Sequence, residues 1–177
     1  QAGLQTLEER EVHLERQEIT IVEHGDWADI ELFEVYRNTT SDRQEVIYYF
    51  TLPESAVITG LWLGNSPNRT ERFAYHVAPR GAAQAVYRNE VRLNLDPALI
   101  EQIGPRQYRL RIFPVPPVSL TFDDRTARTR VGEAPPLYLW LTWKTLLDSQ
   151  GWHLPRLTLK QNIYWDDDTV RLINGVE

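Results

Sequence analysis

The stretch EVIYYFTLP at residues 45–53, followed directly by ESAVITGL at residues 54–61, is the strongest fold signal in this chain. Its side chains alternate with the period of two that an extended strand requires, and they are the β-branched and aromatic types that suit a pleated sheet. We therefore expect two strands that meet at a tight corner at Pro53, the first of them buried on both faces or nearly so. The side chains expected on one face are Val46, Tyr48, Phe50 and Leu52.

Length and composition describe a chain that can form one hydrophobic core. The 177 residues are 42% hydrophobic and 25% charged, and a chain of this length buries roughly 70% of its unfolded surface without metals or disulfides. We expect a single domain over residues 1–177. The formal net charge of -6 opposes attraction to phosphate backbones, so nucleic acid is not an expected partner.

Two residue types are missing from the sequence. Without Cys there is no disulfide, no Cys-based zinc site and no thiol nucleophile. Without Met, even at position 1, the chain is expected to be a processed form or a piece of a longer protein. No run approaches the roughly 18 apolar residues of a membrane span, so membrane contact is expected only through segments outside these residues.

Alternating runs on both sides of residues 45–53 predict an antiparallel β meander. Residues 11–24 change phase near Gln17, which indicates a bulge. Residues 137–147 carry large apolar side chains in both phases, which predicts a central strand. Further strands are expected at residues 27–37, 56–63, 73–77, 107–115, 154–159 and 162–173.

The hydrophobic period changes between residues 80 and 103. Apolar and Ala residues recur at intervals of three and four over residues 81–91, which predicts an amphipathic helix. Asp96 and Pro97 have the pattern of an N-cap followed by Pro at the first helical position, and a second short helix would run to Ile103. We expect an antiparallel β-sandwich with one or two short α-helices at about 80–103.

Residues 118–136 are the least regular part of the chain. They contain the polar run DDRTARTR and the Pro-containing segment EAPP. We expect an irregular insertion that forms an exposed loop or a mobile hairpin.

Two acidic runs are candidates for calcium binding, because hard oxygen ligands in a loop are what this ion takes. One contains Asp123 and Asp124, and the other is the run DDD at residues 166–168. Neither has the spaced register of a calcium loop, and acidic runs more often solvate a turn. The four histidines show no i, i+4 pair that would grip a metal. No metal and no other cofactor is therefore expected.

Catalytic signatures are missing from the sequence, and we expect that the chain is not an enzyme. There is no Gly-x-Ser-x-Gly, no Gly-x-Gly-x-x-Gly and no phosphate-binding Walker loop. Glu90, Asp96 or Glu101 could supply paired carboxylates for glycoside hydrolysis, but spacing along the chain does not fix the separation that this mechanism requires. Glu90 and Glu101 are expected to cap or to face solvent. Side chains expected on the exposed side of a strand are Arg106, Arg109 and Arg111.

Six tryptophans remain as candidates for contacts. Trp62, Trp140 and Trp143 lie in strand patterns and are expected in the core. The other three lie near turns, where an exposed indole could stack on a sugar or anchor a partner, although core packing is the more frequent role. The candidate contact residues are Trp27, Trp152, Trp165, Asp123 and Asp124.

An ordered series of short motifs resembles the vault protein/inter-alpha-trypsin inhibitor (VIT) domain. Residues 45–53 match a Glu-Ala-x-Tyr-x-Phe-x-Leu-Pro strand, with Val46 in place of the small residue, and the next strand matches Ala-x-x-x-Gly-Phe. Together the motifs span most of residues 28–157. The remaining matches are Ala56, Gly60, Leu61, Ala83, Tyr87, Ala98, Leu99, Glu101, Gln102, Tyr108, Val115, Pro116 and Pro117.

The resemblance implies a non-catalytic interaction or structural module that contacts a protein partner or other domains of its parent chain. The von Willebrand A segment that usually accompanies this domain does not follow within the chain. Residues 81–111 also resemble the extracytoplasmic part of bacterial integral membrane proteins of the PEP-CTERM sorting system, which implies a periplasmic or cell-surface location. The alternative is a carbohydrate-binding or carbohydrate-active β-sandwich that uses tryptophans and acidic residues at its turns.

Overall fold

The computed structural model describes residues 11–75, 98–126, 128–160 and 162–177, and within them it is built almost entirely of β-strands. The larger sheet has the strand order β12-β1-β2-β10-β4-β5, and β13 pairs with β1 beside β12. Both of these C-terminal strands run parallel to β1, whereas the other neighbours are antiparallel. The strands of this sheet are β1 (Val12–Glu23), β2 (Trp27–Asn38), β4 (Val57–Gly64), β5 (Phe73–Tyr75), β10 (Leu137–Leu146), β12 (Ile163–Tyr164) and β13 (Val170–Ile173).

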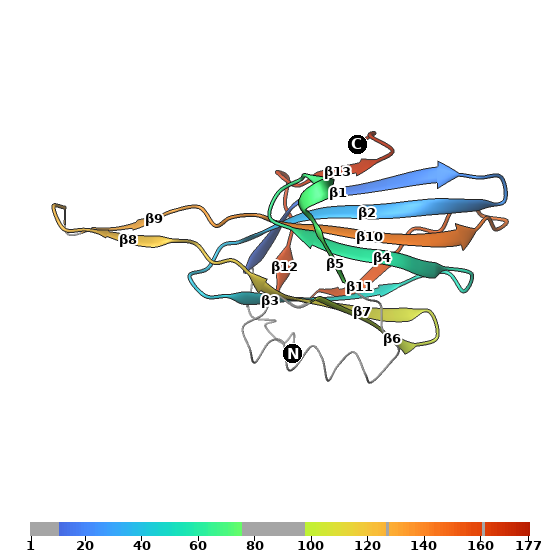
Figure 1. Ribbon diagram of the computed structural model, residues 1–177, viewed down its shortest axis with the longest axis horizontal. Coiled ribbons are helices and arrows are strands. Elements are labelled where there is room, and N and C mark those ends of the chain that lie inside the picture. Colours follow the sequence, from blue (N-terminus) through green and yellow to red (C-terminus); the bar gives the residue numbers. More distant parts are fainter. Residues whose placement is uncertain (1–10, 76–97, 127, 161) are drawn as a thin grey trace, which may run out of the picture.

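The smaller sheet is antiparallel and has the order β11-β3-β7-β6. A third sheet consists of two strands only and projects from one end of the molecule (Figure 1). A short 3-10 helix, η1 (Arg69–Glu71), lies between β4 and β5. The strands are β3 (Gln44–Thr51), β6 (Ala98–Gly104), β7 (Gln107–Val115) and β11 (Arg156–Lys160) in the smaller sheet, and β8 (Leu120–Asp123) and β9 (Arg128–Val131) in the third.

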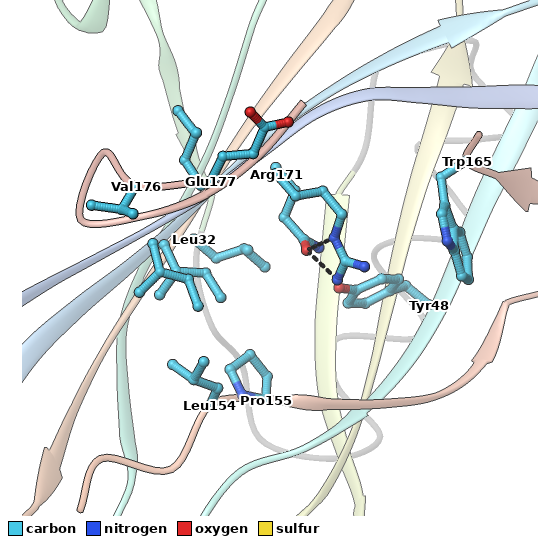
Figure 2. Close-up of a pocket in the computed structure, with 12 residues that line it drawn as sticks. Leu32, Tyr48, Leu154, Pro155, Trp165, Arg171, Val176 and Glu177 are labelled. Atoms are coloured by element: carbon cyan, nitrogen blue, oxygen red, sulfur yellow. Dashed lines mark hydrogen bonds between the residues drawn. The ribbon is translucent and has the colours of Figure 1, made fainter. Parts of the chain in front are cut away.

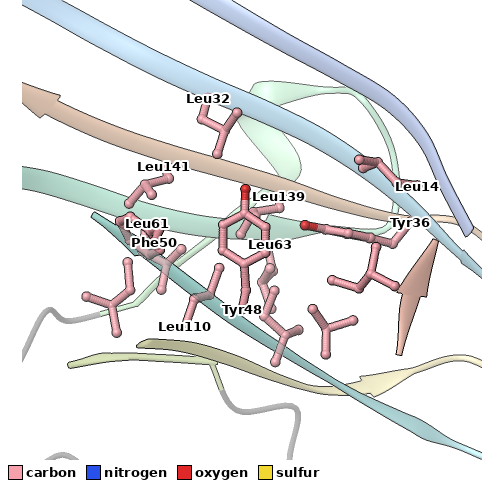
Figure 3. Packing of buried hydrophobic residues seen from close by; sticks show 14 of the residues in the cluster. Leu14, Leu32, Tyr36, Tyr48, Phe50, Leu61, Leu63, Leu110, Leu139 and Leu141 are labelled. Atoms are coloured by element: carbon pink, nitrogen blue, oxygen red, sulfur yellow. The ribbon is translucent and has the colours of Figure 1, made fainter. Parts of the chain in front are cut away.

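The two large sheets lie face to face and enclose one hydrophobic core, so the predicted β-sandwich is confirmed (Figures 1 and 3). Each strand alternates between residues that point into the core and residues on the outer face, as the pleat requires. The larger sheet contributes Val12, Leu14, Ile30, Leu32, Tyr36, Leu61, Leu63, Leu139, Leu141 and Trp143, and the smaller sheet contributes Val46, Tyr48, Phe50, Ile100, Leu110, Ile112 and Val115.

Residues 45–53 form β3 and the corner after it, as predicted. The inner face of β3 is fully buried, whereas the outer face is half-buried. The corner at Pro53 is held by two backbone hydrogen bonds: the Leu52 N–H donates to the Arg106 carbonyl (3.1 Å), and the Ala56 N–H donates to the Pro53 carbonyl (3.0 Å). The corner is thus tied to the β6–β7 turn of its own sheet.

Two further strand predictions are confirmed by the pairing. The register of β1 against β2 shifts between Leu14 and Arg16, close to the phase change that the sequence shows near Gln17. This bulge lets Gln17 and Ile19 take the inward phase of the strand. The central strand is β10, which pairs with β2 on one side and with β4 on the other.

The helix predicted to begin at Asp96 and end at Ile103 is wrong. Ala98–Gly104 is strand β6, which pairs with β7 in the register Leu99↔Arg111 and Ile100↔Leu110. The Gly-Pro pair that resembled a helix stop belongs to the tight turn between β6 and β7, in which Arg106 has φ 62. Pairing along β7 overrides the local helix signals. The helix predicted at residues 81–91 lies outside the described residues.

Two residues hold the first turns of the fold in place. The buried Asn38 side chain donates to the Asp42 carbonyl (2.7 Å) and to the Val115 carbonyl (3.1 Å), while its Oδ1 accepts from Thr40 N (2.8 Å). Gly60, one of the positions that carry the family resemblance, lies beneath the Trp62 ring, which a Cβ at this position would overlap. Asn38 and Gly60 therefore fix local geometry rather than expose chemistry.

Residues 118–136 contain the hairpin β8–β9 (Figure 1). The hairpin was one of the two alternatives that the sequence left open. Over the described ranges, no helix has the length and the apolar character needed to cross a membrane.

Candidate functional site

A pocket of about 710 Å³ lies at one edge of the sandwich, between the two sheets. This volume is in the usual range of small-molecule sites. Figure 2 shows that its walls come from segments far apart in the sequence: β1, β2 and β13 of the larger sheet, β3 of the smaller one, and the segments before β11, after β12 and after β13. The apolar lining consists of Ile19, Leu32, Leu154, Pro155, Leu172, Ile173 and Val176.

A buried carboxylate lies behind one end of this pocket. Glu34 is on the inner face of β2 and has no exposed surface. Its Oε1 accepts from Gln17 Nε2 (2.6 Å) and from the Tyr48 hydroxyl (3.3 Å), and its Oε2 accepts from the Tyr36 hydroxyl. Burial, followed by the charge of Glu34, raises the pKa of both Tyr36 and Tyr48 well above the ordinary tyrosine value. Both tyrosines therefore stay neutral donors to the carboxylate.

Arg171 brings a cation to the same end of the pocket. Its Nε and Nη2 both donate to Gln17 Oε1, at 3.2 and 3.0 Å, so the guanidinium is linked to Glu34 through the Gln17 amide. No described carboxylate lies within ion-pair distance of Arg171. The carboxylate of Glu177, at the rim, points away from the guanidinium (Figure 2).

Of the three turn tryptophans, Trp165 is the one that lines the pocket, and its surface is 49% exposed. Trp152 packs against the core and donates its Nε1 to Glu23 Oε1 (2.7 Å). Trp27 lies at the start of β2 and does not line this pocket.

Trp27 is engaged by its own neighbours. Its ring stacks on His24 with centroids 4.1 Å apart, and Lys144 Nζ lies 4.4 Å from the ring centroid. Lys144 also pairs with Asp29 at 3.0 Å, and this hydrogen bond lowers the pKa of the Asp29 carboxyl. Trp27 thus takes part in a local surface cluster.

The β8–β9 hairpin, called the arm below, exposes a continuous apolar face. Leu120 pairs with Val131 and Phe122 pairs with Thr129, so the three apolar side chains share one face of the two-stranded ladder. Their exposed fractions are 55% for Leu120, 64% for Phe122 and 67% for Val131. In the described part of the chain, β8 and β9 pair only with each other.

The base of the arm is fixed to the sandwich. The Val118 N–H donates to the Thr40 carbonyl (2.9 Å) on one side, and Arg37 Nη1 donates to the Ala134 carbonyl (2.6 Å) on the other. The direction of the arm is therefore set by contacts at the end of β2.

Both acidic runs bond the backbone of their own turns. Asp123 Oδ1 accepts from Arg125 N (2.9 Å) at the tip of the arm, where Asp124 is exposed. Asp166 Oδ1 accepts from Asp168 N (3.1 Å) and lies 3.0 Å from His13 Nε2. Among the described residues, no three His, Asp or Glu side chains gather as a group that could hold a metal ion.

The predictions for the three strand tryptophans and for Glu101 are confirmed only in part. Trp143 is in the core and Trp140 is buried on the outer face of the larger sheet, whereas Trp62 is half-buried beneath Arg72, whose Cζ lies 4.2 Å from its ring centroid. The prediction that Glu101 caps or faces solvent is wrong, because its side chain is 2% exposed and lies 3.0 Å from Arg109 Nη2. The Arg109 side chain is half-buried, so it does not lie fully on the exposed side of β7 as predicted.

The sequence did not single out the polar end of the pocket. One signal was present: Glu34 occupies the same phase of β2 as the apolar residues Ile30, Leu32 and Tyr36. A carboxylate in the inward phase of a strand must find donors in the core. Gln17 and Arg171 carry no comparable signal, because they are separated by 154 residues in the sequence.

Comparison with known proteins gives one family. The family model described as the vault protein inter-alpha-trypsin domain (VIT) matches residues 14–123, more than half of the chain. The match begins in β1 and ends with β8, so the second strand of the arm and the central strand β10 lie beyond it. The curated proteins contain no match to this sequence.

Proposed function

Since the chain belongs to the VIT domain family, we propose that it is a non-catalytic interaction or structural module whose arm contacts a protein partner or another domain of its parent chain. The exposed apolar face of the arm carries this proposal. Single exposed apolar residues are common on protein surfaces, but a contiguous apolar face on a projecting element is typical of an interaction site.

The physical state of the arm supports a role in binding. An isolated two-stranded hairpin is marginally stable in water, and another strand can add to the edge of such a ladder. A partner that covers Leu120, Phe122 and Val131 would bury apolar surface, and a strand added to β8 or β9 would extend the ladder. The anchors at Thr40 and Ala134 present this face in a fixed direction.

Two phenylalanines of matched exposure allow a direct test. Phe122 on the arm is 64% exposed and Phe73 on β5 is 63% exposed. A photo-crosslinking amino acid at each position, in the full-length parent protein in its own cell, should yield an adduct from position 122 and not from position 73. With the purified adduct partner, Phe122→Asp should weaken binding about tenfold or more, while Phe73→Asp leaves it unchanged. Equal adducts at both positions, or equal affinity of both variants, would refute the proposal.

The parent protein is proposed to be membrane-anchored and to carry this module outside the cytoplasm, as part of a bacterial PEP-CTERM-type protein. The support is the resemblance of residues 81–111. Alkaline phosphatase, which is active only after export, can be fused to the domain within the full-length parent. High phosphatase activity is expected, and activity confined to a cytoplasmic reporter such as β-galactosidase would contradict this location.

A carbohydrate-binding module is the second candidate, because Trp165 is half-exposed at a pocket that also contains Arg171 and Gln17. A glycan array separates the two functions. Clear binding that is lost with Trp165→Ala or Trp152→Ala would favour the carbohydrate function over the plain interaction module. The absence of any bound glycan would leave the arm as the functional element.

A further inference from the structure

We propose that the pocket at the sandwich edge binds an apolar carboxylate of the acyl-chain type, with its chain between the sheets and its carboxylate on Arg171. This inference is independent of the arm. It rests on the shape of the pocket, the distribution of its polar groups and a guanidinium at one end that pairs with no described carboxylate.

The walls of the pocket suit a flexible hydrocarbon chain. Leu32 of the larger sheet lies opposite Leu154 and Pro155 (Figure 2). Ile19 of β1, Leu172 and Ile173 of β13, and Val176 in the turn after β13 complete the apolar lining. A volume of about 710 Å³ exceeds that of any single side chain and fits a chain of medium length. Trp165 stands at the pocket wall, where its ring can cover part of the ligand (Figure 2).

The polar end of the pocket suits an anion. Arg171 uses Nε and Nη2 for the single acceptor Gln17 Oε1, so no hydrogen bond to a described residue occupies Nη1. A guanidinium prefers a carboxylate, with which it forms paired charge-assisted hydrogen bonds. Arg171 is an exposed residue, so a ligand can reach it without opening the core.

The same end of the pocket disfavours a cation. Glu34 is the nearest buried acid, but its carboxylate already accepts from Gln17, Tyr36 and Tyr48 and has no exposed surface. A peptide is also a poorer occupant, because its backbone needs donors and acceptors along its length. The polar side chains of the lining are Gln17, Tyr48 and Arg171 at one end and Glu177 at the rim, and the indole N–H of Trp165 is the remaining polar side-chain group.

The test compares three probes of equal chain length with the full 177-residue chain: dodecanoate, dodecanol and dodecylamine, each below its aggregation limit. Isothermal titration should give one dodecanoate per chain, with about tenfold or greater preference over the alcohol. The ammonium should bind no better than the alcohol. In ¹⁵N spectra, the Trp165 indole signal should shift on addition of dodecanoate, whereas the Trp27 signal, from a ring already stacked on His24, should not.

Two Arg variants separate the carboxylate contact from general charge. Arg171→Gln removes the guanidinium but keeps an amide that can donate to Gln17 Oε1, and it should abolish the preference for the acid over the alcohol. The melting temperature of this variant checks that the chain remains folded. Arg128→Gln, on the arm, is the control and should bind like the unmodified chain. The proposal is overturned if dodecanoate fails to saturate the chain, if it binds no tighter than dodecanol, or if Arg171→Gln keeps the preference. A short apolar peptide that binds tighter than dodecanoate would also overturn it.

Discussion

The sandwich and the arm use the same kinds of residue in opposite ways. In the sandwich, Phe50 and Tyr48 of β3 are buried among the strands of both sheets. In the arm, Phe122 and its two apolar neighbours lie in water on a ladder of two strands. The sandwich is therefore stabilised by its own burial, whereas the apolar residues of the arm contribute nothing to it.

The first test of this contrast is a pair of identical substitutions. Phe50→Ala removes a ring that is 1% exposed and should cost about 4 kcal/mol of unfolding free energy through lost burial and the cavity left behind. Phe122→Ala should change the same quantity by less than about 0.5 kcal/mol. Urea unfolding measures both. A loss at Phe122 approaching that at Phe50 would mean that the arm is part of the cooperative core.

The second test concerns carboxylates in the two regions. Glu34→Ala would leave Gln17, Tyr36 and Tyr48 without their acceptor and should cost about 3 kcal/mol. Asp124→Ala, at the exposed tip of the arm, should be near neutral. Urea unfolding at neutral pH compares them. If Glu34→Ala were as mild as Asp124→Ala, the buried polar cluster would have no structural role.

The third test uses pH. Because the pKa of Tyr48 is raised in the folded state, the folded chain holds this proton more tightly than the unfolded chain. The protonated Tyr48 hydroxyl therefore stabilises the fold. This stabilisation is fully present below about pH 10, the ordinary tyrosine pKa, and is lost as the pH rises further. Above that pH, each such tyrosine should lower the unfolding free energy by up to about 1.4 kcal/mol per pH unit.

The matched variant for this effect is Tyr48→Phe, which has no ionisable hydroxyl. Between about pH 9 and pH 11 its unfolding free energy should fall less than that of the unmodified chain, which still titrates both Tyr36 and Tyr48 on unfolding. Parallel pH profiles of the two proteins would contradict the burial of Tyr48 against Glu34.

Sequence alone predicted most of the strands and little of the pocket. Local alternation of apolar and polar side chains predicts the strand at residues 45–53, the bulge near Gln17 and the central strand at residues 137–147. The strand Ala98–Gly104 is not predicted in this way, because Asp96-Pro97 and the following Gly-Pro pair have the pattern of helix boundaries. Pairing with β7 makes this segment a strand.

The pocket depends on contacts that no local pattern encodes. Trp165 is a candidate contact residue from its place near a turn. Arg171 is not predicted as one, because it contacts Gln17 only when β13 pairs in parallel with β1. This pairing brings together two residues that are 154 positions apart in the sequence. The arm was foreseen as an exposed insertion, yet its apolar face required the register of Leu120 against Val131.

Removal of the arm tests the separation of the two regions most directly. The Gly132 N–H donates to the Ser119 carbonyl (2.7 Å), so an Asn-Gly turn can replace residues 120–131 without moving the sandwich. The unfolding free energy of this variant, measured in urea, should lie within about 0.5 kcal/mol of the unmodified chain. A loss of several kcal/mol would contradict the account, because it would make the arm a structural part of the sandwich.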